Sequence, residues 1–160
     1  MNPLVKRIAQ QHQEKGSITG LQKVLVCLQA QHISYWTSHW QARGPTAYSD
    51  HLLFERLYNG VREEIDALAE KLVAMYGGEH VSAGFLGVHL SSCLKRFEDV
   101  EDAVDRGLFS EEALLELIEQ AYDQLEDSGG LTMGMDDLLM TIADSHETHI
   151  YLLQQRQASN

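Results

Sequence analysis

The feature that most constrains the fold of this chain is one long run of helical periodicity. From about Tyr48 to Met75, apolar side chains recur every three or four residues. The inward positions are Phe54, Tyr58, Val61, Ile65, Leu68, Leu72 and Met75. At ~1.5 Å per residue the predicted helix is about 40 Å long, and it ends at Gly77-Gly78. Such length is unusual in a small globular protein and typical of a long helical bundle.

A similar stripe precedes this run and predicts a second helix beside it. The stripe opens near Ser17 or Thr19 and ends near Ala42. Its inward positions are Leu21, Leu25, Leu28, His32, Tyr35 and His39. Gly44 can cap this helix at its carboxyl end, and Pro45 cannot continue it. We therefore expect a tight turn near residue 45 and two antiparallel helices.

Residues 81–128 allow two interpretations. In the first, a short helix from Val81 to about Phe97 is followed by a loop containing Gly107 and a helix over 110–126. In the second, one interrupted helix runs through Gly107, because inward spacing continues to Leu125. A turn at 127–130 leads to a last helix over about 134–155, whose inward residues are Leu138, Leu139, Ile142, His146, Ile150 and Leu153.

Together these patterns predict an all-α four-helix bundle with an extra short helix in the connection between the second and third helices. No segment shows the alternation of a strand. We expect a single domain over 1–160, with residues 1–16 as an N-terminal extension and 17–156 as the bundle.

Charge and cysteine content restrict the classes of partner. The net charge of −12 disfavours contact with nucleic-acid phosphates, and Lys6, Arg7 and Lys15 are too few for a basic arm. Cys27 and Cys93 form no C-x-x-C motif, and we expect both to be buried small apolar residues. No apolar run approaches 18 residues. These features favour a cytoplasmic protein without a membrane segment.

Four residues suggest metal chemistry: His39, His51, Asp66 and Glu70. Asp66 and Glu70 are one helical turn apart and share a face, while the histidines flank the turn near Pro45 and face each other across the hairpin. Imidazole and carboxylate ligands suit iron, with zinc as a possible substitute.

The helix geometry limits how these four residues can meet. His51 and Asp66 lie 15 positions apart on one helix, or about 22 Å. No single metal ion spans that distance. If the four form one site, each site takes the two histidines from one subunit and the two carboxylates from another, and a two-fold dimer creates two such sites.

The residues around these ligands resemble the Dps miniferritins of the ferritin-like superfamily. The resemblance is carried by the run from Ser38 to Pro45, by His51 with Phe54 and Tyr58, and by residues 66–72. The key spacings are 12, 15 and 4 residues, and the last helix has a weaker likeness. The chain contains no Glu-x-x-His, the pair with which other ferritin-like proteins build a site inside one bundle.

The resemblance implies that His39, His51, Asp66 and Glu70 are ferroxidase ligands. Members of that family assemble hollow dodecamers from two-fold dimers, oxidise Fe²⁺ with hydrogen peroxide or oxygen, store ferric mineral, and protect the cell from oxidative stress. It also implies that Trp36 and Trp40 quench radicals and that Asp136 and Asp137 line an iron pore. Many members bind DNA through a lysine-rich tail, which this sequence lacks, so we expect no strong direct DNA binding.

Simpler readings stay open beside these. The bundle could be a structural or metal-binding assembly without ferroxidase activity, or an unrelated helical interaction module. The tryptophans are explained more simply by packing, and the acidic pair by favourable first-turn charge. His146 and His149 could bind metal at their spacing of three, although a partly buried helix face explains them more simply.

Overall fold

The computed structural model describes residues 15–158, with side chains from Gly20 onward. Five α-helices and one 3-10 turn follow in order: α2 (Lys15–Gln41), α3 (Ala47–Tyr76), η1 (Gly78–Val81), α4 (Ala83–Glu98), α5 (Ala103–Asp127) and α6 (Met133–Gln157). No strand occurs between residues 15 and 158. The all-α prediction is confirmed. The N-terminal extension as far as residue 14 lies outside the described residues.

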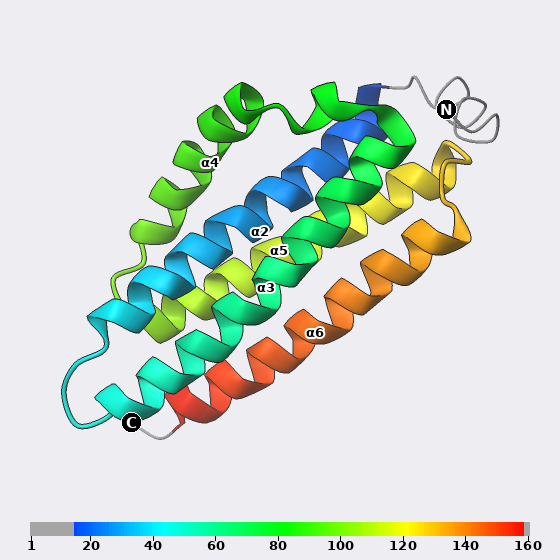
Figure 1. The fold of residues 1–160 in the computed structure, drawn as a ribbon. Coiled ribbons are helices and arrows are strands. Elements are labelled where there is room, and N and C mark those ends of the chain that lie inside the picture. The colour runs from blue at the N-terminus through cyan, green and yellow to red at the C-terminus, as the bar shows by residue number, and fades with distance from the viewer. Residues whose placement is uncertain (1–14, 159–160) are drawn as a thin grey trace.

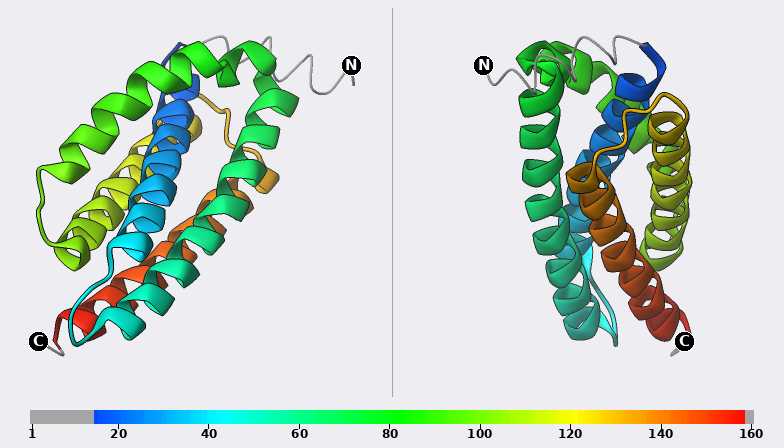
Figure 2. Two further views of the ribbon diagram at one scale, coloured as in Figure 1. Left: turned by 60° about the vertical axis from the view of Figure 1, so that its left-hand side comes forward. Right: turned by 90° about the vertical axis from the view of Figure 1, so that its right-hand side faces the viewer.

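Helices α2, α3, α5 and α6 form the four-helix bundle (Figure 1). Helix α4 lies outside it along α2 and returns the chain from one end to the other, so α5 runs in the same direction as α3 (Figure 2). This is the predicted extra helix between the second and third bundle helices. Gly44, with φ of 82°, allows the tight turn between α2 and α3 because glycine tolerates that conformation.

The core is a continuous set of aliphatic side chains along the inner faces of the bundle. Its fully buried members include Leu21, Leu25, Leu28, Leu57, Val61, Leu68, Leu72, Leu114, Leu125, Leu139 and Leu153. Each such side chain contributes about 1.5–3 kcal/mol through burial. The predicted inward stripes of α2 and α3 are largely confirmed, although His32, Tyr58 and Ile65 are only partly buried.

The structure decides between the two interpretations of residues 81–128: two separate helices form, as in the first, but the chain is helical through Gly107, as in the second. The break between α4 and α5 lies at residues 99–102, and Asp102 caps α5 by accepting hydrogen bonds from the backbone of Val104 and Asp105. Gly107 is inside α5 and buried. A Cβ atom there would lie 3.0 Å from Leu153 Cδ2, so glycine lets α5 and α6 approach closely.

An ion pair between Asp50 and Arg156 joins the beginning of α3 to the end of α6. Arg156 also donates to Thr46 Oγ1 at 2.8 Å, and Thr46 donates to Asp50 Oδ2 at 2.8 Å. Burial alone would raise the pKa of Asp50, but hydrogen bonds from Arg156 and Thr46 outweigh it and lower that pKa below its ordinary value. The lowered pKa means that the ionised carboxylate stabilises the fold.

Replacing Asp50 with asparagine is expected to lower the free energy of unfolding by about 1–2 kcal/mol. This loss lies between those typical of breaking an exposed ion pair and of breaking a buried one. Because the pKa of Asp50 is lowered on folding, its contribution to the free energy of unfolding is fully present above the unfolded pKa of about 4. That contribution is lost as the pH falls through the lower pKa of the folded state. Urea unfolding of both proteins at several pH values measures the difference. The exposed Glu63→Gln variant of the same helix is the control. A constant difference down to pH 2 would contradict the prediction.

Candidate metal sites

His39 and His51 meet across the α2–α3 hairpin, as predicted. Their rings stack with centroids 3.6 Å apart. His39 Nδ1 lies 2.8 Å from the backbone oxygen of His51, and His51 Nδ1 lies 3.0 Å from that of His39. A carbonyl only accepts, so each Nδ1 carries a proton, and in the neutral form of each ring Nε2 keeps a free lone pair. Metal-binding histidines are commonly oriented in this way.

Aromatic side chains surround this pair. Tyr58 is edge-on to His39, with ring centroids 5.4 Å apart, and also contacts Trp36 at 6.2 Å. Trp36 and Trp40 are tilted against each other at 4.8 Å. Their exposed fractions of 42% and 58% show that neither belongs to the core of the subunit. An exposed pair of this size is typical of a surface that another protein covers.

Asp66 and Glu70 are exposed on α3, one turn apart. The helix is continuous from Ala47 to Tyr76, so the separation of 15 positions between His51 and Asp66 keeps these side chains about 22 Å apart along the axis. Among the described residues of one subunit, the two histidines and the two carboxylates form no common cluster of ligand atoms. The four residues thus lie in two separate pairs on one subunit, and their assignment as metal ligands stays a prediction.

Asp136 lies in the first turn of α6 and Asp137 follows it directly. Thr132 caps the helix by accepting a hydrogen bond from the backbone N–H of Met135. Asp137 is exposed and borders the same surface depression as Glu70. Negative charge is favoured at this end of a helix, so the charges have a structural explanation as well. Their role in a pore stays a prediction.

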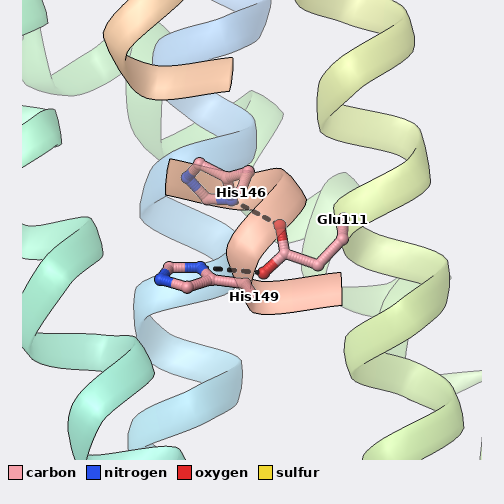
Figure 3. A group of neighbouring side chains, drawn as sticks. All are labelled: Glu111, His146 and His149. Carbon is pink, nitrogen blue, oxygen red and sulfur yellow. Dashed lines mark hydrogen bonds and ion pairs between the residues drawn. The ribbon is translucent and has the colours of Figure 1, made fainter. Parts of the chain in front are cut away.

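The structure also gathers three ligand-type residues in the middle of the bundle. Glu111 reaches from α5 toward His146 and His149 of α6 (Figure 3). The exposed fractions are 0% for Glu111, 0% for His146 and 6% for His149. The expectation of a partly buried helix face for the two histidines was therefore wrong. One ligand atom from each residue can be chosen so that all three lie within 4.8 Å of one another.

Hydrogen bonds from two other helices, α2 and α6, meet at Glu111. His146 Nδ1 forms a very short contact with Oε2, and His149 Nδ1 lies 3.2 Å from Oε1. From α2, Tyr35 donates to Oε1 at 2.5 Å and Gln31 Nε2 donates to Oε2 at 3.2 Å. All the acceptor positions of the carboxylate are thus used. We call Glu111, His146, His149 and these α2 partners the bundle-centre cluster.

Glu64 of α3 completes the bundle-centre cluster by contacting His146 Nε2 at 2.8 Å. Burial alone lowers the pKa of His146, but hydrogen bonds from Glu111 and Glu64 outweigh it and raise that pKa to about 9. Burial alone raises the pKa of Glu111, whereas hydrogen bonds from His146 and His149 lower it to about 2. An imidazolium ion therefore lies between two carboxylates at neutral pH.

The amino-acid sequence of α5 contains one indication of the bundle-centre cluster, which is the position of Glu111 among the inward apolar residues of that helix. Glu111 occupies an inward position between the buried residues Val104 and Gly107 on one side and Leu114 and Ile118 on the other. A carboxylate at such a position is rarely fully buried without a partner. His146 and His149 at a spacing of three supply the matching basic residues.

Cys27 and Cys93 lie near each other although the sequence separates them widely. Cys27 is buried as expected, whereas Cys93 is only partly buried. The pKa of the Cys27 thiol is raised, mainly by a hydrogen bond with the Cys93 thiol and in second place by burial. Both are free thiols.

Among the helices described, none is both long enough and apolar enough to cross a membrane.

Comparison with known proteins places most of the chain in one family. A family model described as a ferritin-like domain matches residues 18–157. A protein of Kitasatospora aureofaciens described as an uncharacterized protein in the bpoA2 5′ region is 42% identical over 57 residues. That match covers 36% of this chain and 38% of that protein, little more than a third of either length.

Solved structures of similar shape have Dps in their names. DpsC from Streptomyces coelicolor superposes with a TM-score of 0.74 at 26% identity, covering 88% of this chain and 83% of that chain. Dps from Thermosynechococcus elongatus gives 0.72 at 20% identity, covering 96% and 94%. A Dps protein from Vibrio cholerae O1, described as a member of a broad superfamily of ferritin-like diiron-carboxylate proteins, gives 0.72 at 20% identity, covering 93% and 92%.

Proposed function

Because this chain belongs to the ferritin-like family, as a miniferritin of the Dps type, we propose that it is a ferroxidase and an iron-storage protein. It oxidises Fe²⁺ with hydrogen peroxide or oxygen at sites shared between two subunits, and it keeps the ferric product inside a hollow assembly. We further propose a dodecamer of two-fold dimers in the cytoplasm, without strong DNA binding because of its net charge of −12.

The observation that carries this proposal is the His39–His51 pair. Both Nδ1 atoms are held by backbone carbonyls, so both Nε2 atoms are free to bind the substrate ion. Asp66 and Glu70 present two carboxylates elsewhere on the surface of the same helix. A two-fold axis that pairs the hairpins brings the histidines of one subunit to the carboxylates of the other. Trp36 and Trp40, exposed beside the histidines, would be covered by that contact.

The chemistry follows from the ligand types. Neutral imidazole and carboxylate bind Fe²⁺ and leave coordination positions open for the oxidant. The carboxylates stabilise the higher charge of Fe³⁺, which favours loss of the electron. Hydrogen peroxide takes one electron from each of two Fe²⁺ ions and, with two protons, becomes two water molecules. Trp36 and Trp40 lie where they could reduce a radical formed at this site, while Asp136 and Asp137 would draw Fe²⁺ toward Glu70.

Anaerobic addition of Fe²⁺ followed by peroxide tests the proposal. We expect rapid ferric absorbance with the wild type and oxidation about a hundredfold slower with Asp66→Ala, since even partners of metal ligands affect activity by about 10- to 100-fold. Asp144→Ala, which removes an exposed carboxylate of α6, is the control. Two results would favour the alternative of an assembly without ferroxidase activity. One is wild-type protein that oxidises Fe²⁺ no faster than buffer alone, and the other is an Asp66→Ala variant that oxidises it as fast as the wild type.

A further inference from the structure

We propose that the bundle-centre cluster is a second metal site, in which Glu111, His146 and His149 bind one divalent transition-metal ion inside each subunit. It differs from the shared site in its ligands and in needing no second subunit. Two imidazoles and one carboxylate are a ligand set of Fe²⁺ and Zn²⁺ sites that keep an open position. The spacing of the two histidines places them on one face of α6, opposite Glu111 of α5.

The dimensions of the cluster are close to those that a metal ion needs. Metal–nitrogen and metal–oxygen bonds of about 2.0–2.2 Å place two ligand atoms at most about 4.4 Å apart. The ligand atoms here lie within 4.8 Å of one another. A contraction of a few tenths of an ångström brings the widest pair of ligand atoms within that limit, whereas the very short contact between His146 Nδ1 and Glu111 Oε2 has to lengthen to admit the ion. In the metal-free protein the hydrogen bond from His146 Nδ1 to Glu111 Oε2 fills this place, and the metal ion would replace that proton.

The surroundings hold these ligands in the orientation that metal binding requires. Glu64 Oε2, 2.8 Å from His146 Nε2, accepts the proton of the nitrogen that faces away from Glu111. Such a carboxylate–histidine–metal arrangement is common in metal sites. Tyr35 donates to Glu111 Oε1 and fixes that carboxylate from α2. Glu64 and Tyr35 are thus positioning residues in this proposal.

A second and independent observation concerns Gln31. It is completely buried, and its amide reaches the cluster through Nε2, 3.2 Å from Glu111 Oε2. Its Oε1 atom is buried without any hydrogen-bond partner among the described residues. Buried polar atoms without partners are rare, because each costs about 1–3 kcal/mol. The unpaired oxygen belongs to a side chain that already touches Glu111, so a polar ligand atom without a partner lies next to the cluster.

Metal titration of a protein without the shared site tests this inference. Chelator-treated Asp66→Ala/Glu70→Ala protein is titrated with Zn²⁺ by calorimetry and with Co²⁺ by visible absorption. We expect one equivalent per chain and a Co²⁺ spectrum of a nitrogen- and oxygen-ligated ion. Introducing Glu111→Gln into this protein should abolish the binding. Introducing His149→Asn should weaken the metal affinity at least tenfold, because even the loss of a residue that only supports a ligand weakens metal affinity by about that factor. The control is Glu112→Gln, an exposed neighbour.

The outcomes separate this inference from the proposed ferroxidase activity. Absence of binding to the Asp66→Ala/Glu70→Ala protein, or binding that Glu111→Gln leaves unchanged, would overturn the second site and leave the shared site untouched. Loss of oxidation in Asp66→Ala with retained Co²⁺ binding would support both sites. If circular dichroism shows that Glu111→Gln does not fold, His149→Asn decides, because it leaves the Glu111–His146 contact in place.

Discussion

Replacing Glu111 with alanine is expected to lower the free energy of unfolding of the metal-free protein by about 3–5 kcal/mol, the usual cost of removing one partner of a buried ion pair. Glu111 is completely buried and accepts from His146, His149, Tyr35 and Gln31. Without it, an imidazolium raised to a pKa of about 9 loses one of its two carboxylates. Since whole domains are stable by about 5–15 kcal/mol, the variant should be close to unfolding.

Urea unfolding with a chelator present, at one fixed subunit concentration, measures this loss. The matched control is Glu112→Ala, one residue further along α5 and exposed, where a change within about 0.5 kcal/mol is expected. Equal stability of the two variants would show that the hydrogen bonds around Glu111 contribute little to folding. The four hydrogen bonds that the Glu111 carboxylate accepts would then need another explanation.

A paired substitution asks whether the bundle-centre cluster serves stability at all. Burying ions is costly, and apolar replacements of similar volume are often neutral or stabilising. Glu111→Met combined with His146→Leu should therefore unfold less easily than Glu111→Ala alone, although it lacks two of the proposed ligands. Thermal unfolding of the two proteins gives the comparison. A double variant that is the less stable of the two would contradict this expectation, because leaving His146 without Glu111 would then cost less than replacing both partners with apolar side chains.

Most of the architecture was predictable because local signals determine helices. Apolar stripes gave α2 and α3, and Gly44 with Pro45 gave the turn between them. Gly107 was ambiguous for a physical reason. Its small size serves a close approach to Leu153 on a helix far away in the sequence, and a glycine read locally suggests a loop instead.

The two candidate sites differ in the same way. His39 and His51 flank one short turn, so their spacing alone predicts that they meet. The bundle-centre cluster joins α2, α3, α5 and α6, and its assembly depends on how four helices are rotated about their axes. A hydrophobic stripe shows which face is inward but not which inward residues share a level. The carboxylate at position 111 was the clue, and its partners required the structure.

Mixing two inactive variants is expected to restore ferroxidase activity if the iron site is shared between subunits. His51→Ala removes a ligand from one half-site, and Asp66→Ala removes one from the other. Each homodimer then lacks a ligand at both of its sites. A dimer with one subunit of each kind has one intact site, formed by His51 of the Asp66→Ala subunit and by Asp66 of its partner. The second site of that dimer lacks both ligands.

Random assembly at equal amounts gives half mixed dimers, so about a quarter of the wild-type activity should return, from a background near zero. The measurement is peroxide-driven ferric absorbance after the two chains are denatured together and refolded. The control is wild type refolded in the same way with a chain carrying both substitutions. If the site is shared, the mixed dimers of this control hold no intact site, because one site lacks Asp66 and the other lacks His51. The wild-type homodimers, about a quarter of all dimers, then give about a quarter of the wild-type activity. A site within one subunit would give no recovery from the two inactive variants, because each chain lacks a ligand of its own. That outcome would contradict the inference drawn from the separation of 15 helical positions between His51 and Asp66.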